Sequence, residues 1–151
     1  MGDYYREGKV FEKNYSLALE YYQKAAERDC PDAYICYGIL YTQGIIFQKD
    51  YKKANEYFQK AAKQNYALGF YYLATSYMEG NGFDQDYTKA MELYQKAGEY
   101  GLPDGYLQIG YLYQEGKGVK EDISKAITFY EKAAYNGCSD GFNVIGFLYE
   151  D

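Results

Sequence analysis

Apolar and aromatic residues recur at helical spacing along this chain and group into pairs of amphipathic helices. One stripe has the spacing i, i+3, i+4 and i+7, which places its members on one face of a helix. Its members are Tyr106, Ile109, Gly110 and Tyr113. A second stripe follows a short turn and combines small with large side chains. Its members are Ala126, Phe129, Tyr130, Ala133 and Ala134. The pattern predicts a helical hairpin in which large rings pack against small residues.

Residues at the ends of the two stripes support this interpretation. Gly116 follows the first stripe and suits the left-handed conformation that ends many helices. Asp122 precedes the second stripe, where its carboxylate can accept a hydrogen bond from the first free amides of the helix. Gly137 follows the second stripe, and we expect it to close that helix.

The same hairpin recurs every 36 residues, with no insertion or deletion. The repeated tyrosines are Tyr5, Tyr41, Tyr77, Tyr113 and Tyr149, and the repeated glycines are Gly8, Gly44, Gly80 and Gly116. The repeated alanines are Ala18, Ala54, Ala90 and Ala126. The repeated doublets are Lys24-Ala25, Lys60-Ala61, Lys96-Ala97 and Lys132-Ala133. Because a lone hairpin of this size cannot bury both of its faces, neighbouring hairpins must stack on one another.

The sequence therefore predicts an all-α fold, a right-handed α/α superhelical solenoid of about four 36-residue helix-turn-helix repeats. We expect one domain over residues 1–151. Its expected units are a partial first repeat at 1–32, full repeats at 33–68, 69–104 and 105–140, and a lone first helix at 141–151.

The third full unit resembles the Sel-one-like repeat, a relative of the tetratricopeptide repeat. The residues that carry the resemblance are Ile109-Gly110-Tyr111-Leu112-Tyr113, Gly116-Lys117-Gly118-Val119, Asp122, Lys125-Ala126, Tyr130 and Lys132-Ala133-Ala134. The pattern covers essentially the whole chain. The resemblance implies a superhelix that serves as an adaptor or scaffold for protein complexes.

Two turns depart from the pattern of this family. The turn is nearly intact at Gly80-Asn81-Gly82-Phe83, but it reads Gly44-Ile45-Ile46-Phe47 and Gly8-Lys9-Val10-Phe11 in the earlier units. We expect these two turns to be less well formed or differently bent.

Composition and charge narrow the classes of function. The chain contains no His, which removes the commonest general base and zinc ligand. Its net charge is −6 and it has no basic run, which argues against binding to nucleic acid or to an anionic membrane surface. No segment resembles a signal peptide or reaches the length of a membrane span. We therefore expect a soluble chain, cytoplasmic by default, without cofactor or metal.

Most of the 23 tyrosines are expected to build the core. The predicted core tyrosines are Tyr5, Tyr21, Tyr22, Tyr34, Tyr37, Tyr41, Tyr57, Tyr77, Tyr94, Tyr106, Tyr113, Tyr130 and Tyr149. Tyr15, Tyr51 and Tyr87 follow the predicted N-caps and are expected to pack under the turns.

Positions opposite the core stripe of each first helix should line a concave groove, as the tetratricopeptide relatives imply. The predicted groove residues are Arg6, Ile35, Ile39, Gln43, Tyr71, Thr75, Met78, Glu79, Leu107, Tyr111, Gln114, Glu115 and Phe147. Together with the neighbouring positions at the ends of these helices, this face of the first helices holds nine acidic residues and one basic residue, with apolar residues between them. The acidic residues are Asp3, Glu7, Asp32, Glu79, Asp104, Glu115, Asp140, Glu150 and Asp151. This pattern predicts a protein or peptide partner that carries basic and apolar residues. As an alternative to a role in binding, three of the acidic residues, Asp32, Asp104 and Asp140, only cap the N-termini of their helices.

Two other roles stay open. The segment Gly141–Tyr149 is apolar on most sides, unlike a polar solenoid cap, so the chain is either part of a longer array or self-associates through its uncapped ends.

Some cysteine-rich bacterial members of the family are reported to bind penicillins or hydrolyse β-lactams. Their recurring cysteine corresponds here to Ala26, Ala62, Gly98 and Ala134. Because no catalytic motif is present either, we expect no enzymatic activity.

The three cysteines do not form a recognisable framework. Cys30 and Cys138 share a repeat column with Tyr66 and Leu102, which indicates packing. Cys36 lies six residues after Cys30, and a disulfide between these two is conceivable but not required by the sequence.

Overall fold

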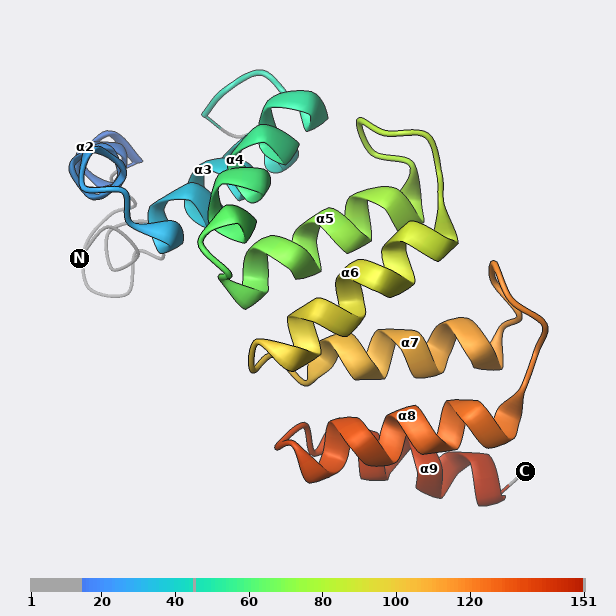
Figure 1. The fold of residues 1–151 in the computed structure, drawn as a ribbon. Helices are drawn as coiled ribbons and strands as arrows, with labels where there is room; N and C mark the ends of the chain where they lie inside the picture. Colours follow the sequence, from blue (N-terminus) through green and yellow to red (C-terminus); the bar gives the residue numbers. More distant parts are fainter. Residues whose placement is uncertain (1–14, 45, 151) are drawn as a thin grey trace.

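The computed structural model describes residues 15–44 and 46–150, which form eight helices (Figure 1). The first helices of the hairpins are α3 (Pro31–Gln43), α5 (Ala67–Glu79), α7 (Asp104–Gln114) and α9 (Asp140–Glu150). The second helices are α2 (Tyr15–Glu27), α4 (Tyr51–Lys63), α6 (Tyr87–Glu99) and α8 (Ile123–Tyr135). None of these described helices is long and apolar enough to span a membrane.

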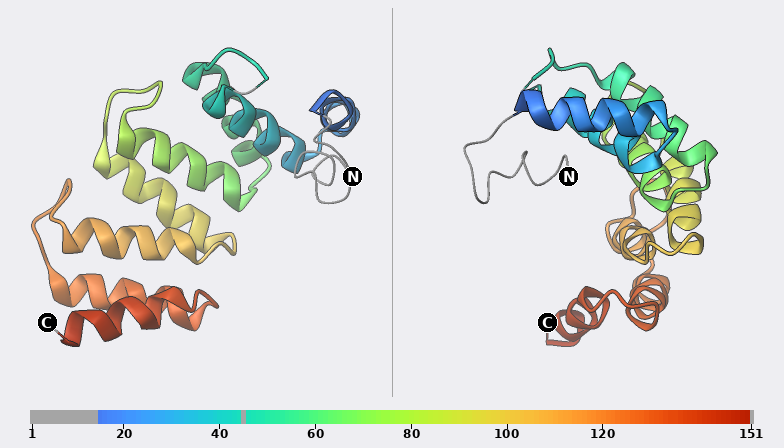
Figure 2. Two further views of the ribbon diagram at one scale, coloured as in Figure 1. Left: turned by 180° about the vertical axis from the view of Figure 1, so that it is seen from behind. Right: turned by 90° about the vertical axis from the view of Figure 1, so that its left-hand side faces the viewer.

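Successive helices pack against one another along a curved array. In Figure 2 (right) the helices follow an arc, with α7 and α9 on its inner side and α6 and α8 on its outer side. The surface that the first helices present to the inside of this arc is called the inner face. The predicted all-α solenoid of 36-residue hairpins is thereby confirmed.

Each second helix of the full repeats begins at a capping aspartate, as predicted for Asp122. The carboxylate accepts a hydrogen bond from the backbone N–H three residues later. The pairs are Asp50–Lys53 (3.0 Å), Asp86–Lys89 (2.9 Å) and Asp122–Lys125 (2.9 Å). The N–H of each aspartate also donates to a tyrosine carbonyl at the end of the preceding helix. These pairs are Asp50–Tyr41 (3.1 Å), Asp86–Tyr77 (2.9 Å) and Asp122–Tyr113 (2.9 Å). Both bonds close the turn and fix where the second helix starts.

The first helices begin differently. Asp32, Asp104 and Asp140 lie within the first turns of α3, α7 and α9 rather than at an N-cap. The alternative that they are N-caps is therefore wrong. Their charges instead complement the positive end of each helix dipole.

The turns after the first helices use glycine where the backbone is left-handed. Gly44, Gly80 and Gly116 have φ of +67°, +74° and +62°. Altered turns were predicted at Gly44–Phe47 and Gly8–Phe11. Ile45 of the first turn and all of Gly8–Phe11 lie outside the described residues, so both expectations stay predictions.

The tyrosines occupy the core largely as predicted. Tyr22, Tyr94, Tyr106 and Tyr130 are buried. The half-buried ones are Tyr15, Tyr21, Tyr34, Tyr37, Tyr41, Tyr51, Tyr57, Tyr77, Tyr87 and Tyr113. Tyr5 lies outside the described residues. The prediction for Tyr149 is wrong, because 76% of this residue is exposed on α9. Its equivalent Tyr113 is covered by Phe129 of the following helix α8, whereas no described helix follows α9.

Glycine also brings neighbouring hairpins into backbone contact. A Cβ atom at Gly69 would lie 2.5 Å from the backbone nitrogen of Ala62. At Gly105 and Gly141 it would clash with the carbonyl oxygens of Tyr94 and Tyr130. Each of these three glycines therefore lets a first helix pack directly on the backbone of the second helix before it.

We predict that Gly105→Ala destabilises the fold. The added methyl group meets a backbone oxygen that cannot move without shifting α6, so we expect a loss of about 1–3 kcal/mol in the free energy of unfolding. Urea unfolding followed by circular dichroism measures it. Gly146→Ala is the control, because apart from its chain neighbours and the backbone of its own helix no atom lies within 4 Å of the added Cβ. In a helix this control should gain roughly 0.5–1 kcal/mol. Equal stability of the two variants would contradict the contact.

Candidate functional site

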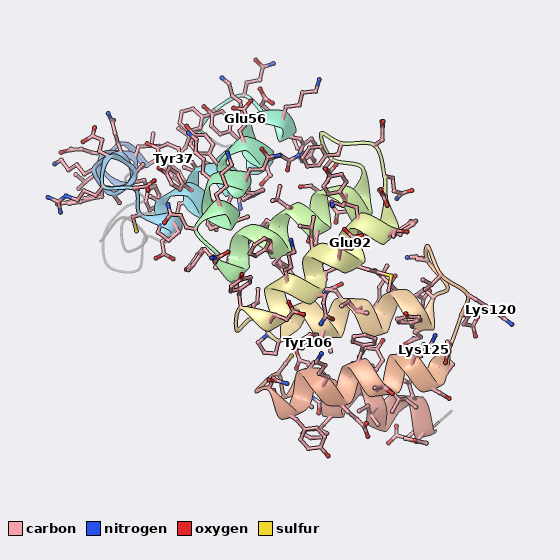
Figure 3. All side chains as sticks on the ribbon, viewed as in Figure 1. Tyr37, Glu56, Glu92, Tyr106, Lys120 and Lys125 are labelled. Carbon is pink, nitrogen blue, oxygen red and sulfur yellow. The ribbon has the colours of Figure 1, made fainter. Side chains whose placement is uncertain are left out.

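The described groove residues predicted from the sequence lie on the first helices or at their ends. Helix α3 carries Ile35, Ile39 and Gln43, and α5 carries Tyr71, Thr75, Met78 and Glu79. Helix α7 carries Leu107, Tyr111 and Gln114, with Glu115 at its C-cap, and α9 carries Phe147. Arg6 lies outside the described residues. In contrast, Glu56 and Glu92, labelled in Figure 3, belong to the second helices α4 and α6.

These residues differ in how accessible they are. Gln43, Glu79, Tyr111, Glu115 and Phe147 are exposed. The apolar residues that are half-buried against the core are Ile39, Tyr71, Met78 and Leu107. Ile35 was expected in the groove, but it is only 5% exposed and belongs to the main core cluster. It is therefore a core residue, out of reach of a partner.

A pocket of about 340 Å³ opens between α7 and α9. Its lining residues are Leu107, Gln108, Tyr111, Gln114, Tyr130 and Val144. Tyr130 comes from α8, and its hydroxyl donates to Oε1 of Gln114 at 2.7 Å. The size falls within the range of pockets that hold small ligands or single anchoring side chains. The structure thus brings three of the predicted residues, Leu107, Tyr111 and Gln114, into one concave site.

A related arrangement lies one repeat earlier, around Tyr94 of α6. The hydroxyls of Tyr94 and Thr75 are 2.9 Å apart, and the Tyr94 hydroxyl lies 3.8 Å from the sulfur of Met78. The ring of Tyr71 packs edge-on against Tyr94, with 5.3 Å between the ring centres. In both repeats a tyrosine of the second helix therefore reaches between first-helix side chains of the inner face.

The pKa values of Tyr94 and Tyr130 depend on burial and on nearby carboxylates. Burial raises the pKa of Tyr130 to about 12, and the charge of Glu115 contributes to the increase. Burial also raises the pKa of Tyr94 despite its hydrogen bond to Thr75, and the charge of Glu79 contributes in the same direction. Burial is thus the main cause at both tyrosines, and one carboxylate of the same repeat adds to it in each case.

Lys117 shows how this surface accommodates a cation. Its Nζ donates to the hydroxyl of Tyr111 at 2.7 Å and lies 4.7 Å from the centre of that ring. The hydrogen bond to Tyr111 is the main cause of the raised pKa of the Lys117 ammonium, to which Glu115 also contributes. The ammonium group of Lys117 therefore contacts both the hydroxyl and the ring of Tyr111, a residue that lines the pocket.

The sequence analysis missed Gln108, Val144 and the pocket role of Tyr130. Tyr130 was predicted as a core residue, and it is buried, but its hydroxyl end reaches the pocket. Gln108 and Val144 share a column with Tyr72, beside the predicted groove column, and no sequence signal separates them from ordinary surface residues. Conversely, Ile39, Gln43 and Phe147 do not line this pocket.

Neither a metal centre nor a disulfide is found in the described part of the chain. No cluster of three or more Cys, Asp and Glu side chains there could hold a metal ion. Cys30, Cys36 and Cys138 form no disulfide with one another.

Comparison with known proteins identifies one family. A family model described as Sel1 repeat matches residues 1–30, 31–66, 67–101 and 103–138. A Sel1 repeat protein from Oxalobacter formigenes is 33% identical, has a TM-score of 0.88, and is matched over 98% of this chain and 60% of its own. A protective antigen of uropathogenic Escherichia coli strains, c5321, which displays an SLR fold, is 31% identical with a TM-score of 0.77. That match covers 100% of this chain and 32% of the antigen.

A third solved structure, cysteine rich protein B of Helicobacter pylori, is 28% identical with a TM-score of 0.64. The match covers 91% of this chain and 98% of that one. The chain spans only 60% and 32% of the first two structures, so similarity to them concerns a part of those proteins. No curated protein matches the chain.

We predict that Tyr130 makes stability depend on alkaline pH. The folded state holds the Tyr130 proton more tightly than the unfolded chain, in which tyrosine ionises near about pH 10. Its contribution to stability is therefore complete below about pH 10 and is lost as the pH rises towards the folded pKa. Tyr130→Phe should weaken this decline, measured by urea unfolding at a series of pH values.

Tyr135→Phe is the matched control, because Tyr135 lies on the same helix with 78% of its surface exposed. This variant should decline with pH as the wild type does. Identical pH profiles for Tyr130→Phe and the wild type would show that the buried hydroxyl has no such role.

Proposed function

Because the chain belongs to the Sel1 repeat family, whose members generally mediate protein interactions, we propose that its inner face binds a segment of a partner protein. The observation that carries this proposal is the pocket between α7 and α9. It is concave, lined largely by apolar and aromatic side chains, and bordered by polar groups, which is the usual composition of a recognition site.

Apolar side chains of the inner face would provide the hydrophobic contribution to binding. Tyr71, Met78 and Leu107 are half-buried, and Tyr111 is exposed beside them. A partner that covers these side chains removes apolar surface from water. Aromatic residues in partly buried positions are also the ones that most often dominate binding energy at protein interfaces.

Charge specifies the kind of partner. Glu79 and Glu115 stand at equivalent places in successive repeats and act on Tyr94 and Tyr130. The position of Lys117 against Tyr111 is an intramolecular example of the contact that a basic side chain can make here. We therefore propose a protein or peptide segment with Lys or Arg beside apolar anchors, and not nucleic acid, because the net charge of −6 repels phosphates.

The proposal predicts that reversing the groove charges weakens binding. The probes are peptides selected from a random display library on the immobilised wild-type chain, then synthesised with a fluorescent label. Fluorescence anisotropy should show roughly three- to tenfold weaker binding to Glu79→Lys and to Glu115→Lys, with less difference at high salt. Selected peptides should be enriched in Lys or Arg next to apolar residues.

Glu131→Lys is the matched control. It makes the same change of charge at an exposed residue of the second helix α8 and should leave affinity unchanged. If the selected peptides bind the wild type, Glu79→Lys and Glu115→Lys equally well, or if selection yields no binder, the groove is not the binding site.

A further inference from the structure

Three equivalent spaces lie between successive first helices of the solenoid. At the base of each stands an aromatic residue from the second helix between them, and these residues are spaced by 36 positions. They are Phe58 of α4, Tyr94 of α6 and Tyr130 of α8. Each space is bordered by one residue from the first helix before it and one from the first helix after it. The bordering pairs, assigned from their repeat positions, are Ile35 and Tyr72, Tyr71 and Gln108, and Leu107 and Val144.

The first two spaces are filled by a ring of this chain. Tyr72 stacks on Phe58, with 4.8 Å between the ring centres and 13° between the planes. Tyr71 packs edge-on against Tyr94 at 5.3 Å, and its hydroxyl accepts a hydrogen bond of 3.4 Å from Nε2 of Gln108. In each case one of the two bordering residues is aromatic and covers the aromatic residue at the base.

The third space has no such ring. Its bordering residues, Leu107 and Val144, are both aliphatic, and within the described part of the chain no aromatic ring packs on Tyr130. This is the space in which the pocket of about 340 Å³ is found. Three of its lining residues, Gln108, Tyr130 and Val144, are the repeat equivalents of the residues that contact the ring or the hydroxyl of Tyr71. Those contacts are Tyr72, Tyr94 and Gln108.

We propose that this pocket receives an aromatic side chain from the partner segment, in the place that Tyr71 occupies one repeat earlier. The inference rests on the proposed function and names its anchoring residue. Two of the three equivalent spaces show that a ring between these helices is compatible with the fold. Because only 2% of Tyr130 is exposed, a ring from the partner would pack mainly on Leu107 and Val144 and meet Tyr130 only where it lines the pocket.

The same comparison indicates phenylalanine rather than tyrosine. The Tyr71 hydroxyl accepts a hydrogen bond from Gln108. The equivalent position at the pocket is Val144, whose side chain has no hydrogen-bond donor. A tyrosine in the same pose would lack that particular hydrogen bond, and losing a hydrogen bond is costly for a hydroxyl that is desolvated on binding. The amides of the pocket, Gln108 and Gln114, stand instead at the repeat positions of Tyr72 and Met78. The partner segment that we propose therefore has phenylalanine near a basic residue that Glu115 attracts.

The decisive variant is Leu107→Tyr, which places a ring of this chain in the pocket as Tyr71 does in the previous repeat. The probe is the same labelled, display-selected peptide, together with a version in which its aromatic residue is replaced by alanine. We expect selected peptides to share one phenylalanine, its replacement to weaken binding by about tenfold or more, and Leu107→Tyr to weaken binding to the same extent. Thermal unfolding should show that Leu107→Tyr is folded.

A second variant, Val144→Gln, tests the preference for phenylalanine independently of any loss of binding. It restores the amide that Gln108 supplies to Tyr71. The wild type should prefer the phenylalanine peptide over its tyrosine version by about three- to tenfold, and Val144→Gln should reduce or reverse this ratio. A structural disturbance alone would weaken both peptides and leave the ratio unchanged.

The outcomes separate this inference from the proposed function. If Glu115→Lys weakens binding but Leu107→Tyr and the alanine peptide do not, the groove binds its partner without an aromatic anchor and this inference is overturned. An unchanged ratio in Val144→Gln overturns the preference for phenylalanine. If none of the groove variants affects binding, the proposed function fails together with the inference.

Discussion

The close approach of the first helices α5, α7 and α9 to the backbone of the second helix before each is the contact on which this structure depends. Gly69, Gly105 and Gly141 make it possible, since a Cβ at any of them would meet backbone atoms. Because the backbones touch, the hairpins stack at a fixed spacing and the first helices form one continuous inner face. The same spacing lets Tyr94 and Tyr130 reach from the second helices to that face.

The residues that repeat most regularly serve this framework. The lysine of the Lys-Ala doublet packs over an aromatic ring of the preceding first helix in three repeats. The pairs are Lys60–Tyr34 (5.5 Å), Lys96–Phe70 (5.6 Å) and Lys132–Tyr106 (4.2 Å), each measured to the ring centre. The capping aspartates are equally regular. Strict repetition in this chain therefore marks structural contacts, because every interface of the solenoid must satisfy the same geometry.

Residues that vary between repeats decide what the inner face can bind. The columns that border the three equivalent spaces read Ile35, Tyr71 and Leu107 on one side, and Tyr72, Gln108 and Val144 on the other. A single aromatic residue in either column fills the space, and its absence from both leaves the pocket open. The framework is thus uniform, and the pocket is open because both residues that border it, Leu107 and Val144, are aliphatic.

The sequence by itself determined the architecture. An unbroken 36-residue period, helical spacing of apolar residues, capping aspartates and turn glycines are local signals, so the helices and the solenoid followed from them. The sequence also assigned Tyr71, Glu79, Leu107, Tyr111 and Glu115 to the first helices and their ends, where the structure places them, while their role in binding stays a proposal. Only the tertiary structure decided which side chains are accessible there. Ile35 is buried and Tyr149 exposed, although their periodicity suggested the reverse.

The pocket was likewise invisible in the sequence. It depends on Tyr130, Gln108 and Val144, which come from three helices and carry no shared motif. Accessibility at one position is set by the size of side chains on neighbouring helices, and helical periodicity within a single segment contains no record of those neighbours. The repeat therefore specifies the scaffold and its inner face, and the packing between repeats specifies where that face is open.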